Sequence, residues 1–428
     1  MADRRKEIVS WCIYDWANSA FALTVMAGFF PVFFKSFWSA GVEPTVSTAR
    51  LGLANASAGL IVAVLSPFLG ALADAGRAKK KLMGFFVLLG VAASGMLFFV
   101  GQGNWIFAIM VFVAASVGFN CANLFYDSLL VDVCEREKMD MVSSLGYSLG
   151  YLGCGLLFLF NVLMVSKPSL FGLSGPASAV KMSFMMASVW WMVFSFPLFL
   201  FVKEKFYSEA RGIITIIQSS MKNLSTTFLK IISDRTLLVF LVAYWLYIDG
   251  LNTFVLMSVD FGLSIGISPK ALMIALLVVQ FVAFPSALVF GFLARRFGAF
   301  SMIVVGIIIY IFVSGIGALM LRTQTDFIIL AGITGMAQGG IQALSRSYFA
   351  KLVPPSESAE YFGFYNVVSR FAVIIGPAVV GMVALLTRKA GFESGTASRI
   401  GMSSISVLFI GGVLLLIWAE VNKKNAIA

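Results

Sequence analysis

Acidic and amide side chains recur at helical spacing inside stretches of this sequence that are otherwise apolar. Asp15 and Asn18 lie three residues apart beside Tyr14, and Asp249 and Asn252 repeat that spacing. Residues three or four apart share one face of a helix. A carboxylate next to an amide on such a face can load and release a proton, coordinate a sodium ion, or hydrogen-bond a polar ligand.

Two further segments carry polar stripes, and a third holds a single cation. Because a charged side chain at the centre of a bilayer costs at least about 2.5–3.5 kcal/mol, each charge should face protein or water. Amides in such stripes can also be interhelical packing contacts, and the charges at the stripe ends can pair with loop charges. Arg370 either pairs with an aspartate or meets an anionic ligand group such as a carboxylate, and both hypotheses stay open. The stripes are Asn120, Asn123 and Asp127, followed by Gln338, Gln342 and Arg346.

The residue types that are missing exclude several kinds of chemistry. The chain has no histidine, which excludes histidine-based acid–base catalysis, metal ligation and pH sensing. Its four cysteines form no Cys-x-x-Cys pair, which argues against a zinc site or a disulfide framework. No nucleophile–base pair or metal cluster stands out. We therefore predict no enzyme activity, no metal, and no cofactor apart from a proton or sodium gradient.

Composition places these polar groups in an integral membrane protein. Of the 428 residues, 60% are hydrophobic and 12% are charged, with a mean hydropathy of +0.95. Soluble domains are about 45–50% apolar and about 25% charged. A transmembrane helix needs roughly 20 mostly apolar residues. Twelve such runs occur, with cores at residues 9–34, 51–73, 82–101, 105–130, 143–165, 181–202, 237–259, 271–293, 301–321, 327–349, 361–386 and 401–419.

The distribution of Lys and Arg predicts how the spans are oriented. With both termini on the cytoplasmic side, the inside segments hold more than twice as many Lys and Arg residues as the outside segments. The net charge of +11 is therefore a topology signal, and we expect no nucleic-acid partner. The sequence predicts an all-α integral membrane protein with twelve transmembrane helices and with its N and C termini in the cytoplasm.

The chain divides into two halves of six spans each. The longest polar stretch, a linker at 203–235, separates an N-terminal bundle at 1–202 from a C-terminal bundle at 236–428. The pattern Trp-x-x-x-Asp-x-x-Asn occurs at 11–18 and again at 245–252, which indicates two pseudo-symmetric six-helix bundles. Apolar residues at helical spacing in the linker predict an amphipathic helix on the inner leaflet, with a plain tether as the alternative. They are Ile213, Ile217, Met221, Leu224, Phe228 and Ile231.

A basic loop and a glycine–proline pair resemble the major facilitator superfamily. After the second span, residues 70–81 read Gly-Ala-Leu-Ala-Asp-Ala-Gly-Arg-Ala-Lys-Lys-Lys, and residues 376–377 in the eleventh span are Gly-Pro. The superfamily usually has an arginine where this chain has Ala75. The resemblance implies a cavity between two six-helix halves that work by rocker-switch alternating access. It also implies gating residues at Asp74, Arg77 and Arg346.

Longer matches point to one branch of that superfamily. The segments Tyr-Asp-Trp-Ala-Asn-Ser-Ala-Phe at 14–21, Tyr-Ile-Asp-Gly at 247–250, Gln-Gly-Gly-Ile-Gln-Ala-Leu-Ser-Arg-Ser-Tyr at 338–348 and Glu-Tyr-Phe-Gly-Phe at 360–364 resemble the bacterial branch of the vacuolar-effluxer-like family. That family is related to the fungal autophagy-linked vacuolar amino-acid exporter. The resemblance covers essentially the whole chain and implies a multi-pass protein of the bacterial inner membrane.

We therefore predict a secondary active transporter of a small polar or zwitterionic metabolite, such as an amino acid, coupled to protons. The alternatives are export of an amphipathic compound, such as a drug or siderophore, and a non-transporting membrane receptor or scaffold. We expect a monomer in the lipid bilayer, with proton coupling at Asp15 and Asp249 and with sodium as the rival coupling ion. The predicted substrate-binding residues are Tyr14, Asp15, Asn18, Asn123, Asp127, Asp249, Asn252, Gln338, Gln342 and Arg370.

Overall fold

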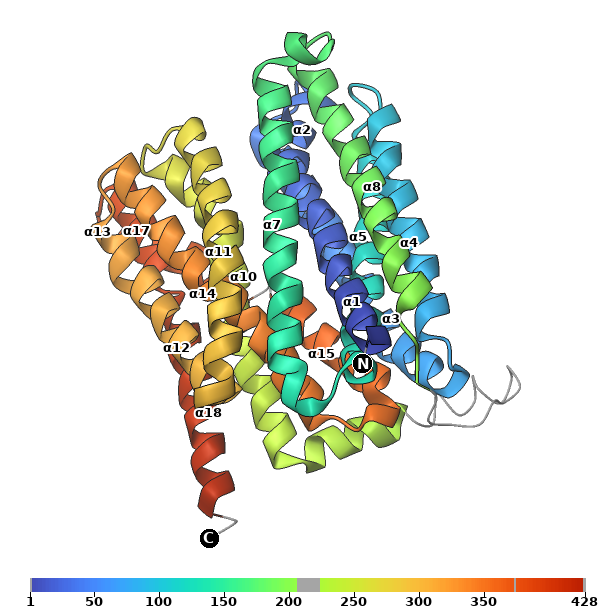
Figure 1. The fold of residues 1–428 in the computed structure, drawn as a ribbon. Coiled ribbons are helices and arrows are strands. Elements are labelled where there is room, and N and C mark those ends of the chain that lie inside the picture. Colours follow the sequence, from blue (N-terminus) through green and yellow to red (C-terminus); the bar gives the residue numbers. More distant parts are fainter. Residues whose placement is uncertain (1, 206–223, 373–374, 426–428) are drawn as a thin grey trace. The chain divides into compact units, whose positions relative to one another are not determined.

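The computed structural model describes residues 2–205, 224–372 and 375–425, and these form helices joined by loops, with no strand among them (Figure 1). Twelve of the helices are long and apolar enough to cross a membrane, which confirms the predicted number of spans. The orientation of the termini stays a prediction. The spans are Arg4–Trp38, Val46–Gly76, Lys79–Phe99, Trp105–Val133, Arg136–Ser166, Pro176–Phe201, Arg235–Ser264, Pro269–Phe297, Ala299–Met320, Gln324–Leu352, Pro355–Lys389 and Ser394–Glu420.

Backbone contacts divide the chain into two compact units. Unit 1 consists of residues 1–222 and 353–366, and unit 2 consists of residues 223–352 and 367–428. The eleventh span is therefore shared, because its first turns belong to unit 1 and its remainder belongs to unit 2. The bundle boundaries that the sequence suggests at 1–202, 203–235 and 236–428 stay a prediction.

The first span of unit 1 is one continuous helix with wide turns. It runs as α1 (Ala2–Ala20), the π-helical η1 (Phe21–Phe29), α2 (Phe30–Phe33) and the π-helical η2 (Phe34–Trp38). Pro31 has no N–H to donate, and the π-type bond from Phe30 N–H to the Val25 carbonyl carries the helix to that point without a break. The other elements of unit 1 are α3 (Pro44–Gly76), α4 (Lys79–Met96), η3 (Leu97–Phe99), α5 (Trp105–Ser128), α6 (Leu130–Val133), η4 (Arg136–Lys138), α7 (Met139–Ser166), η5 (Pro168–Phe171), α8 (Pro176–Phe201), η7 (Pro355–Glu357) and the first part of α15 (Ser358–Phe371).

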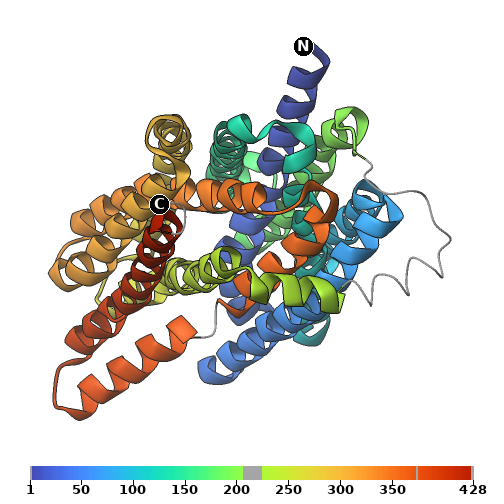
Figure 2. The ribbon, with the colours of Figure 1, turned by 90° about the horizontal axis from the view of Figure 1, so that it is seen from below.

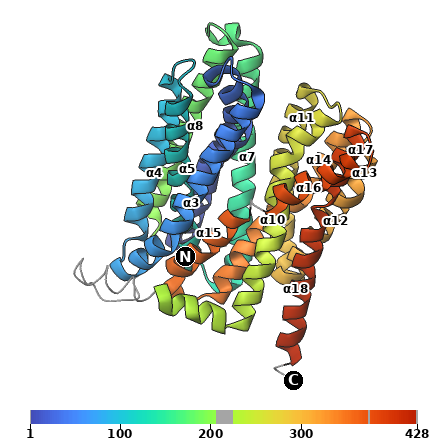
Figure 3. The same ribbon diagram turned by 180° about the vertical axis from the view of Figure 1, so that it is seen from behind.

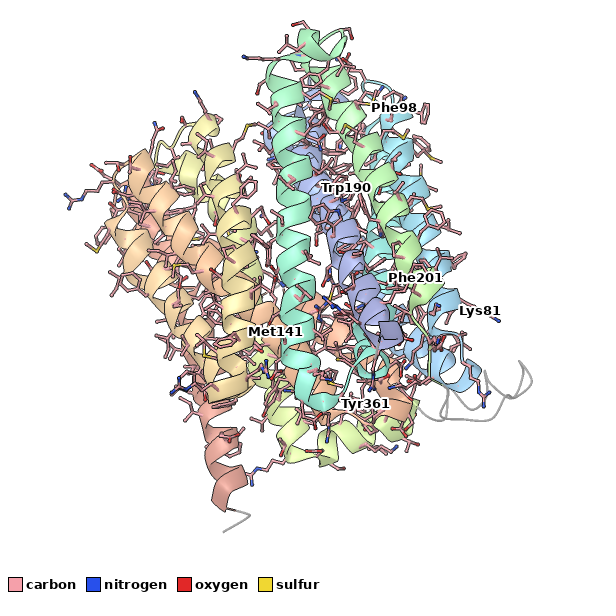
Figure 4. The ribbon with its side chains drawn as sticks, in the orientation of Figure 1. Lys81, Phe98, Met141, Trp190, Phe201 and Tyr361 are labelled. Atoms are coloured by element: carbon pink, nitrogen blue, oxygen red, sulfur yellow. The ribbon has the colours of Figure 1, made fainter. Side chains whose placement is uncertain are left out.

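Helix α1 packs between α7 and α8. A Cβ on Gly150 of α7 would lie 2.7 Å from Ser19 Oγ, and one on Gly153 would lie 2.6 Å from the Trp16 ring, so these glycines allow the close approach. From α8, the Trp190 indole N–H donates to the Trp16 carbonyl at 3.0 Å, and the two indoles stack with centroids 5.5 Å apart (Figure 4). These contacts fix the face of α1 that carries the predicted site residues.

Unit 2 is organised around α10 and α14. Helix α10 (Arg235–Ser264) packs against α16 (Ile375–Lys389), α17 (Ser394–Ser403) and α18 (Ser406–Asn425) (Figure 3). Helix α14 (Gln324–Leu352) packs against α11 (Pro269–Phe297) and α12 (Ala299–Phe312), with η6 (Val313–Gly317) and α13 (Ala318–Met320) following α12.

A short helix at Leu224–Ser233 precedes α10 in unit 2. Its Phe228 side chain is 51% exposed, as expected for the apolar face of a surface helix. Asp234 then caps α10 by accepting the backbone N–H of Thr236 at 2.9 Å. The earlier part of the predicted amphipathic helix, at 213–221, lies outside the described residues, so the inner-leaflet helix stays a prediction.

The described part of the eleventh span consists of two helices, and Pro377 lies in the first turn of the second. A proline is tolerated in the first turn of a helix, where the N–H that it lacks would have no intrahelical partner. Helix α15 ends at Phe371, and α16 begins at Ile375 (Figure 2). The first N–H groups of α16 therefore need acceptors from elsewhere in the protein.

The start of α15 packs backbone to backbone on α3 within unit 1. A Cβ on Gly363 would lie 2.7 Å from the Ser66 carbonyl oxygen, and one on Gly70 would overlap the Ala359 carbonyl. Backbone atoms cannot rotate away as a side chain can. Both positions therefore require glycine for the two helices to remain in contact.

We predict that Gly70→Ala destabilises the protein by separating α15 from α3, whereas Gly59→Ala on the same helix does not. Nothing lies within 4 Å of a Cβ on Gly59, so alanine there should stabilise helix α3 by up to about 1 kcal/mol. The measurement is the thermal unfolding of both purified variants in one detergent. Equal melting temperatures for the two variants would contradict the close contact at Gly70.

Candidate functional site

The predicted polar residues of spans one and four meet in unit 1. Asn18 Nδ2 donates to Asn123 Oδ1 at 2.6 Å, which joins α1 to α5. Closer to the N-terminus of α1, the Tyr14 ring lies 4.7 Å from the Tyr126 ring, and the Trp11 indole N–H donates to the Tyr126 carbonyl at 3.0 Å. The pairs 18–123, 14–126 and 11–126 run in opposite directions along the two helices. The helices are therefore antiparallel with a fixed register.

Two acidic residues stand near Tyr14 in this register. Asp15 follows Tyr14 on α1 and is 6% exposed, whereas Asp127 on α5 is partly exposed. Both carboxylates lie within electrostatic range of the hydroxyl. The Tyr14 Oη and the Trp191 Nε1 of α8 are buried close to each other. The structure thus brings together the five unit 1 residues predicted to bind substrate, namely Tyr14, Asp15, Asn18, Asn123 and Asp127.

Two participants of this region escaped the sequence reasoning. Trp191 sits in an apolar helix and gives no polar signal in the sequence. Asn366 of α15 donates to Ser66 Oγ at 3.1 Å and to the Asn120 carbonyl at 3.3 Å, also within unit 1. The sequence reasoning singled out Arg370, four residues later on the same helix, but not Asn366.

Asp249 in unit 2 binds the N-terminus of α16. Its carboxylate accepts the Gly376 N–H at 3.1 Å (Oδ1) and 3.2 Å (Oδ2), and Oδ1 also accepts the Thr253 hydroxyl at 3.1 Å. The side chain is only 1% exposed. A Cβ on Gly376 would overlap the Thr253 hydroxyl, so glycine allows this approach. Both hypotheses for Arg370, pairing with an aspartate and binding an anionic ligand group, stay predictions.

The other predicted residues of unit 2 lie on three helices. Asn252 on α10, Gln342 on α14 and Arg370 on α15 are partly exposed, while Gln338 is 9% exposed and leaves its Oε1 without a hydrogen-bond partner. Arg346, a predicted gating residue, is 2% exposed on α14. Near them, the Tyr247 hydroxyl and Ser345 Oγ lie 2.7 Å apart and share a hydrogen bond. Their ligand and gating roles stay predictions.

An ion-pair cluster occupies the junction of α3 and α4 in unit 1. Lys79 Nζ lies 3.4 Å from Asp74 Oδ1 and 3.3 Å from Asp132 Oδ2, and it donates to Ser358 Oγ at 2.8 Å. Asp74 Oδ2 in turn accepts the Glu360 N–H of α15 at 2.9 Å. All three charged side chains are buried. The cluster thus ties the start of α15 to two other helices of unit 1.

Arg77, the other predicted gating residue, ends α3 in the left-handed conformation, with φ of 52°. It is the only non-glycine residue with positive φ in the described part of the chain, and it stands at a helix end where glycine is usual. Glu204 holds the following turn, accepting the N–H of Lys79 at 3.0 Å and that of Lys80 at 3.3 Å. The sequence marked Asp74 and Arg77 but missed Lys79 and Asp132, whose charges looked like a topology signal and the end of a span.

Comparison with known proteins identifies the family. The sequence profile described as "Vacuole effluxer Atg22 like" matches residues 3–132 and 131–428, which is nearly the whole chain. The chain belongs to this Atg22-like family. It is 40% identical over 414 residues to the uncharacterized MFS-type transporter YxiO of Bacillus subtilis, covering 96% of this chain and 94% of YxiO. It is 20% identical to autophagy-related protein 22 of Coccidioides immitis, covering 99% of this chain and 88% of that protein.

Solved structures agree with the fold of this Atg22-like protein. The human organic anion transporter MFSD10 matches with a TM-score of 0.67 at 14% identity, covering 96% of this chain and 99% of that one. The proton:xylose symporter XylE also matches with a TM-score of 0.67, at 12% identity, covering 96% and 94%. At these identities the likeness concerns the fold alone. The predicted fold and family are confirmed, and the protein is a multi-pass transporter of the major facilitator type rather than an enzyme.

We predict that Lys79→Met lowers the stability of this Atg22-like protein by about 3 kcal/mol or more, because it leaves two buried carboxylates without their cation. Adding Asp132→Asn should recover part of the loss, since it removes one of the stranded charges. The measurement is thermal unfolding in detergent. The control is Lys81→Met, since Lys81 is exposed on the same helix (Figure 4). A Lys79 variant as stable as the Lys81 variant would show that the cluster contributes nothing.

Proposed function

We propose that the protein is a secondary active transporter that moves a small polar or zwitterionic metabolite, such as an amino acid, by alternating access coupled to protons. Membership of the Atg22-like family and the 40% identity to an MFS-type transporter support transport. In a chain without histidine, proton coupling requires carboxylates, and Asp15 and Asp249 are both buried in spans. We further propose the bacterial inner membrane as its location, because YxiO is bacterial.

The observation that carries the coupling proposal is the set of hydrogen bonds to Asp249. An ionised carboxylate is an acceptor only, and here it accepts one backbone N–H and one hydroxyl. A proton on either oxygen would turn that oxygen into a donor facing the Gly376 N–H, which is also a donor. Protonation would therefore weaken the hold of α10 on the N-terminus of α16. Proton binding to Asp249 would thus be coupled to a conformational change in the eleventh span.

Each unit has predicted residues whose groups suit one end of a zwitterion. The carboxylates of Asp15 and Asp127 can bind an ammonium group, and the Asn18–Asn123 pair offers amide donors and acceptors beside them. Arg370, with Asn252, Gln338 and Gln342 in the same unit, can bind a carboxylate through its guanidinium. We propose these residues as the substrate contacts.

The experiment that identifies the substrate is a thermal-shift screen of the purified protein at two pH values. The probes are the twenty common amino acids, short peptides, siderophores and cationic drugs. A ligand present at 100 times its Kd stabilises the native state by about 2.7 kcal/mol, which raises the melting temperature. We expect a pH-dependent shift with one class of amino acids. Shifts with amphiphiles alone would overturn the proposed substrate class and favour export of amphipathic compounds.

We predict that Asp249→Asn abolishes accumulation driven by a pH gradient but preserves counterflow exchange, because the amide, like the protonated carboxyl, still offers one acceptor oxygen to α16 yet cannot release a proton. The measurement is uptake of radiolabelled neutral amino acids into proteoliposomes, with and without the gradient. Gradient-driven accumulation at the wild-type level would contradict a coupling role for Asp249.

A second pair of variants tests the hold on α16 itself. Gly376→Ala should reduce both accumulation and counterflow at least tenfold, because the new methyl group overlaps the Thr253 hydroxyl and displaces the Asp249 carboxylate. Gly381→Ala on the same helix should leave transport unchanged, because nothing lies within 4 Å of a Cβ there. Equal transport by the two variants would show that the contact between α10 and α16 is dispensable.

A further inference from the structure

Arg50 of unit 1 is a cation without a counter-charge. Its guanidinium carbon lies 3.7 Å from the centre of the Trp105 ring, which is a cation–π contact. In the described part of the chain, no carboxylate pairs with Arg50, and no oxygen accepts a hydrogen bond from it. A guanidinium has five N–H donors and is always charged. One that is partly buried and has no acceptor calls for an explanation.

The three nitrogens of the guanidinium differ in exposure. Nη1 is buried and has no partner. Nε and Nη2 have no partner among the described residues either, but they are not buried, and Arg50 as a whole is partly exposed. These two nitrogens lie on one edge of the planar group, where their N–H bonds match two oxygens of a carboxylate or phosphate. The contact with Trp105 thus leaves open an edge of Arg50 that can bind an oxyanion.

The pair stands at the end of unit 1 where α3 and α5 begin. Arg50 lies in the second turn of α3, Trp105 is the first residue of α5, and the two helices pack against each other (Figure 3). Asn104, the N-cap residue of α5, makes no side-chain cap hydrogen bond. The positive end of the α5 dipole therefore adds to the charge of Arg50.

The charges at this end of unit 1 are mostly positive. Residues 34–53, 97–108 and 163–184, which surround its connections, contain one acidic residue, Glu43. Glu43 is exposed and does not pair with Arg50. The same segments contain the basic residues Lys35, Arg50, Lys167 and Lys181. The local sequence therefore leaves Arg50 to an anion from outside the chain.

Arg50 lies near the start of its span, at the level of lipid headgroups. The span Val46–Gly76 has 31 residues. As an α-helix it is about 46 Å long, which exceeds a hydrocarbon layer of about 30 Å. Its first residues therefore project out of that layer. Tryptophan is enriched at the same level, where its ring is apolar and its N–H is polar.

Exposed apolar side chains continue from the pair along both helices. Leu53, three residues after Arg50 on α3, is 69% exposed, and Ile106 and Met110 on α5 are each 56% exposed. A small soluble oxyanion would gain nothing from this surface. A phospholipid can place its phosphate on the guanidinium and its acyl chains along these side chains.

We propose that Arg50 and Trp105 form a binding site for the phosphate of a phospholipid, whose acyl chains lie along α3 and α5. The phosphodiester has two non-bridging oxygens that share one negative charge, which suits the open Nε–Nη2 edge. The indole ring holds the guanidinium in place, so little side-chain freedom is lost when the lipid binds. Free phosphate has the same chemistry, and the experiment separates the two sources.

The test measures lipid binding to the purified full-length protein in detergent by native mass spectrometry. The probe is dioleoyl-phosphatidylglycerol, and the control ligand is dioleoylglycerol, which has the same acyl chains without the phosphate. We expect the phospholipid to bind at least about tenfold more tightly than dioleoylglycerol, because it adds charge-assisted hydrogen bonds. Arg50→Gln should remove that difference. Lys167→Gln, which removes an exposed cation at the same end of unit 1, should keep it.

Two further variants separate a positioned guanidinium from a general positive charge. Arg50→Lys keeps the charge but loses the paired donors, and Trp105→Leu removes the ring beneath the guanidinium. Both should weaken phospholipid binding, and by less than Arg50→Gln does. If Arg50→Lys binds the phospholipid as tightly as the wild type, the proposed contact is wrong. If Arg50→Gln fails to fold, these two variants decide by the same comparison with the wild type.

Inorganic phosphate distinguishes the two sources of the ligand. Added in large excess, it should not displace dioleoyl-phosphatidylglycerol from the wild type. Displacement would overturn the lipid as the occupant and show that the site takes free oxyanions. Equal phospholipid binding by the wild type and Arg50→Gln would overturn the site itself. These measurements use no transport substrate, so their outcome is independent of the proposed function.

Discussion

Hydrocarbon offers no hydrogen-bond partner, so every charge and every loose backbone donor that this chain places in a span has to be satisfied by protein. Lys79 is paired with two aspartates and donates to a serine hydroxyl, and the Gly376 N–H in the first turn of α16 is satisfied by Asp249. In both places a carboxylate links two helices, so the position of one helix depends on the charge of a group on another.

The duplicated pattern Trp-x-x-x-Asp-x-x-Asn has diverged in what its residues do. In α1 the tryptophan bonds to the Tyr126 carbonyl and the asparagine bonds to Asn123, so the motif joins two helices through its ends. In α10 the Trp245 indole N–H has no partner, and the central aspartate makes the contact to a second helix instead. The repeat therefore preserves positions on a helix face while assigning the joining role to different members.

Much of this organisation could be predicted from the sequence, and the failures share one physical cause. The spans follow from local hydropathy. The polar faces that carry Asn18 and Asn123 follow from the local spacing of polar residues, so both features could be predicted from the sequence. The cluster around Lys79 was not, because its members come from segments far apart in the chain and each has an ordinary local explanation. Trp191 stands in an apolar helix and Asn366 stands beside the more conspicuous Arg370, so the part that each plays becomes visible only through its spatial neighbours. The Gly-Pro pair at 376–377 was visible in the sequence, but Asp249, the partner of the α16 N-terminus, could be found only from the fold.

The unequal lengths of the spans have a consequence for the lipids around this protein. Lys79–Phe99 has 21 residues and Arg4–Trp38 has 35, which correspond to about 31 and 52 Å along ideal α-helices. The short helix matches a hydrocarbon layer of about 30 Å almost without excess, whereas the long one has to tilt or to project beyond it. Acyl chains longer than average would draw the ends of the short helix, with the buried Lys79, into the apolar layer. The thickness of the surrounding bilayer would thus act directly on the ion-pair cluster that joins α3, α4 and α15.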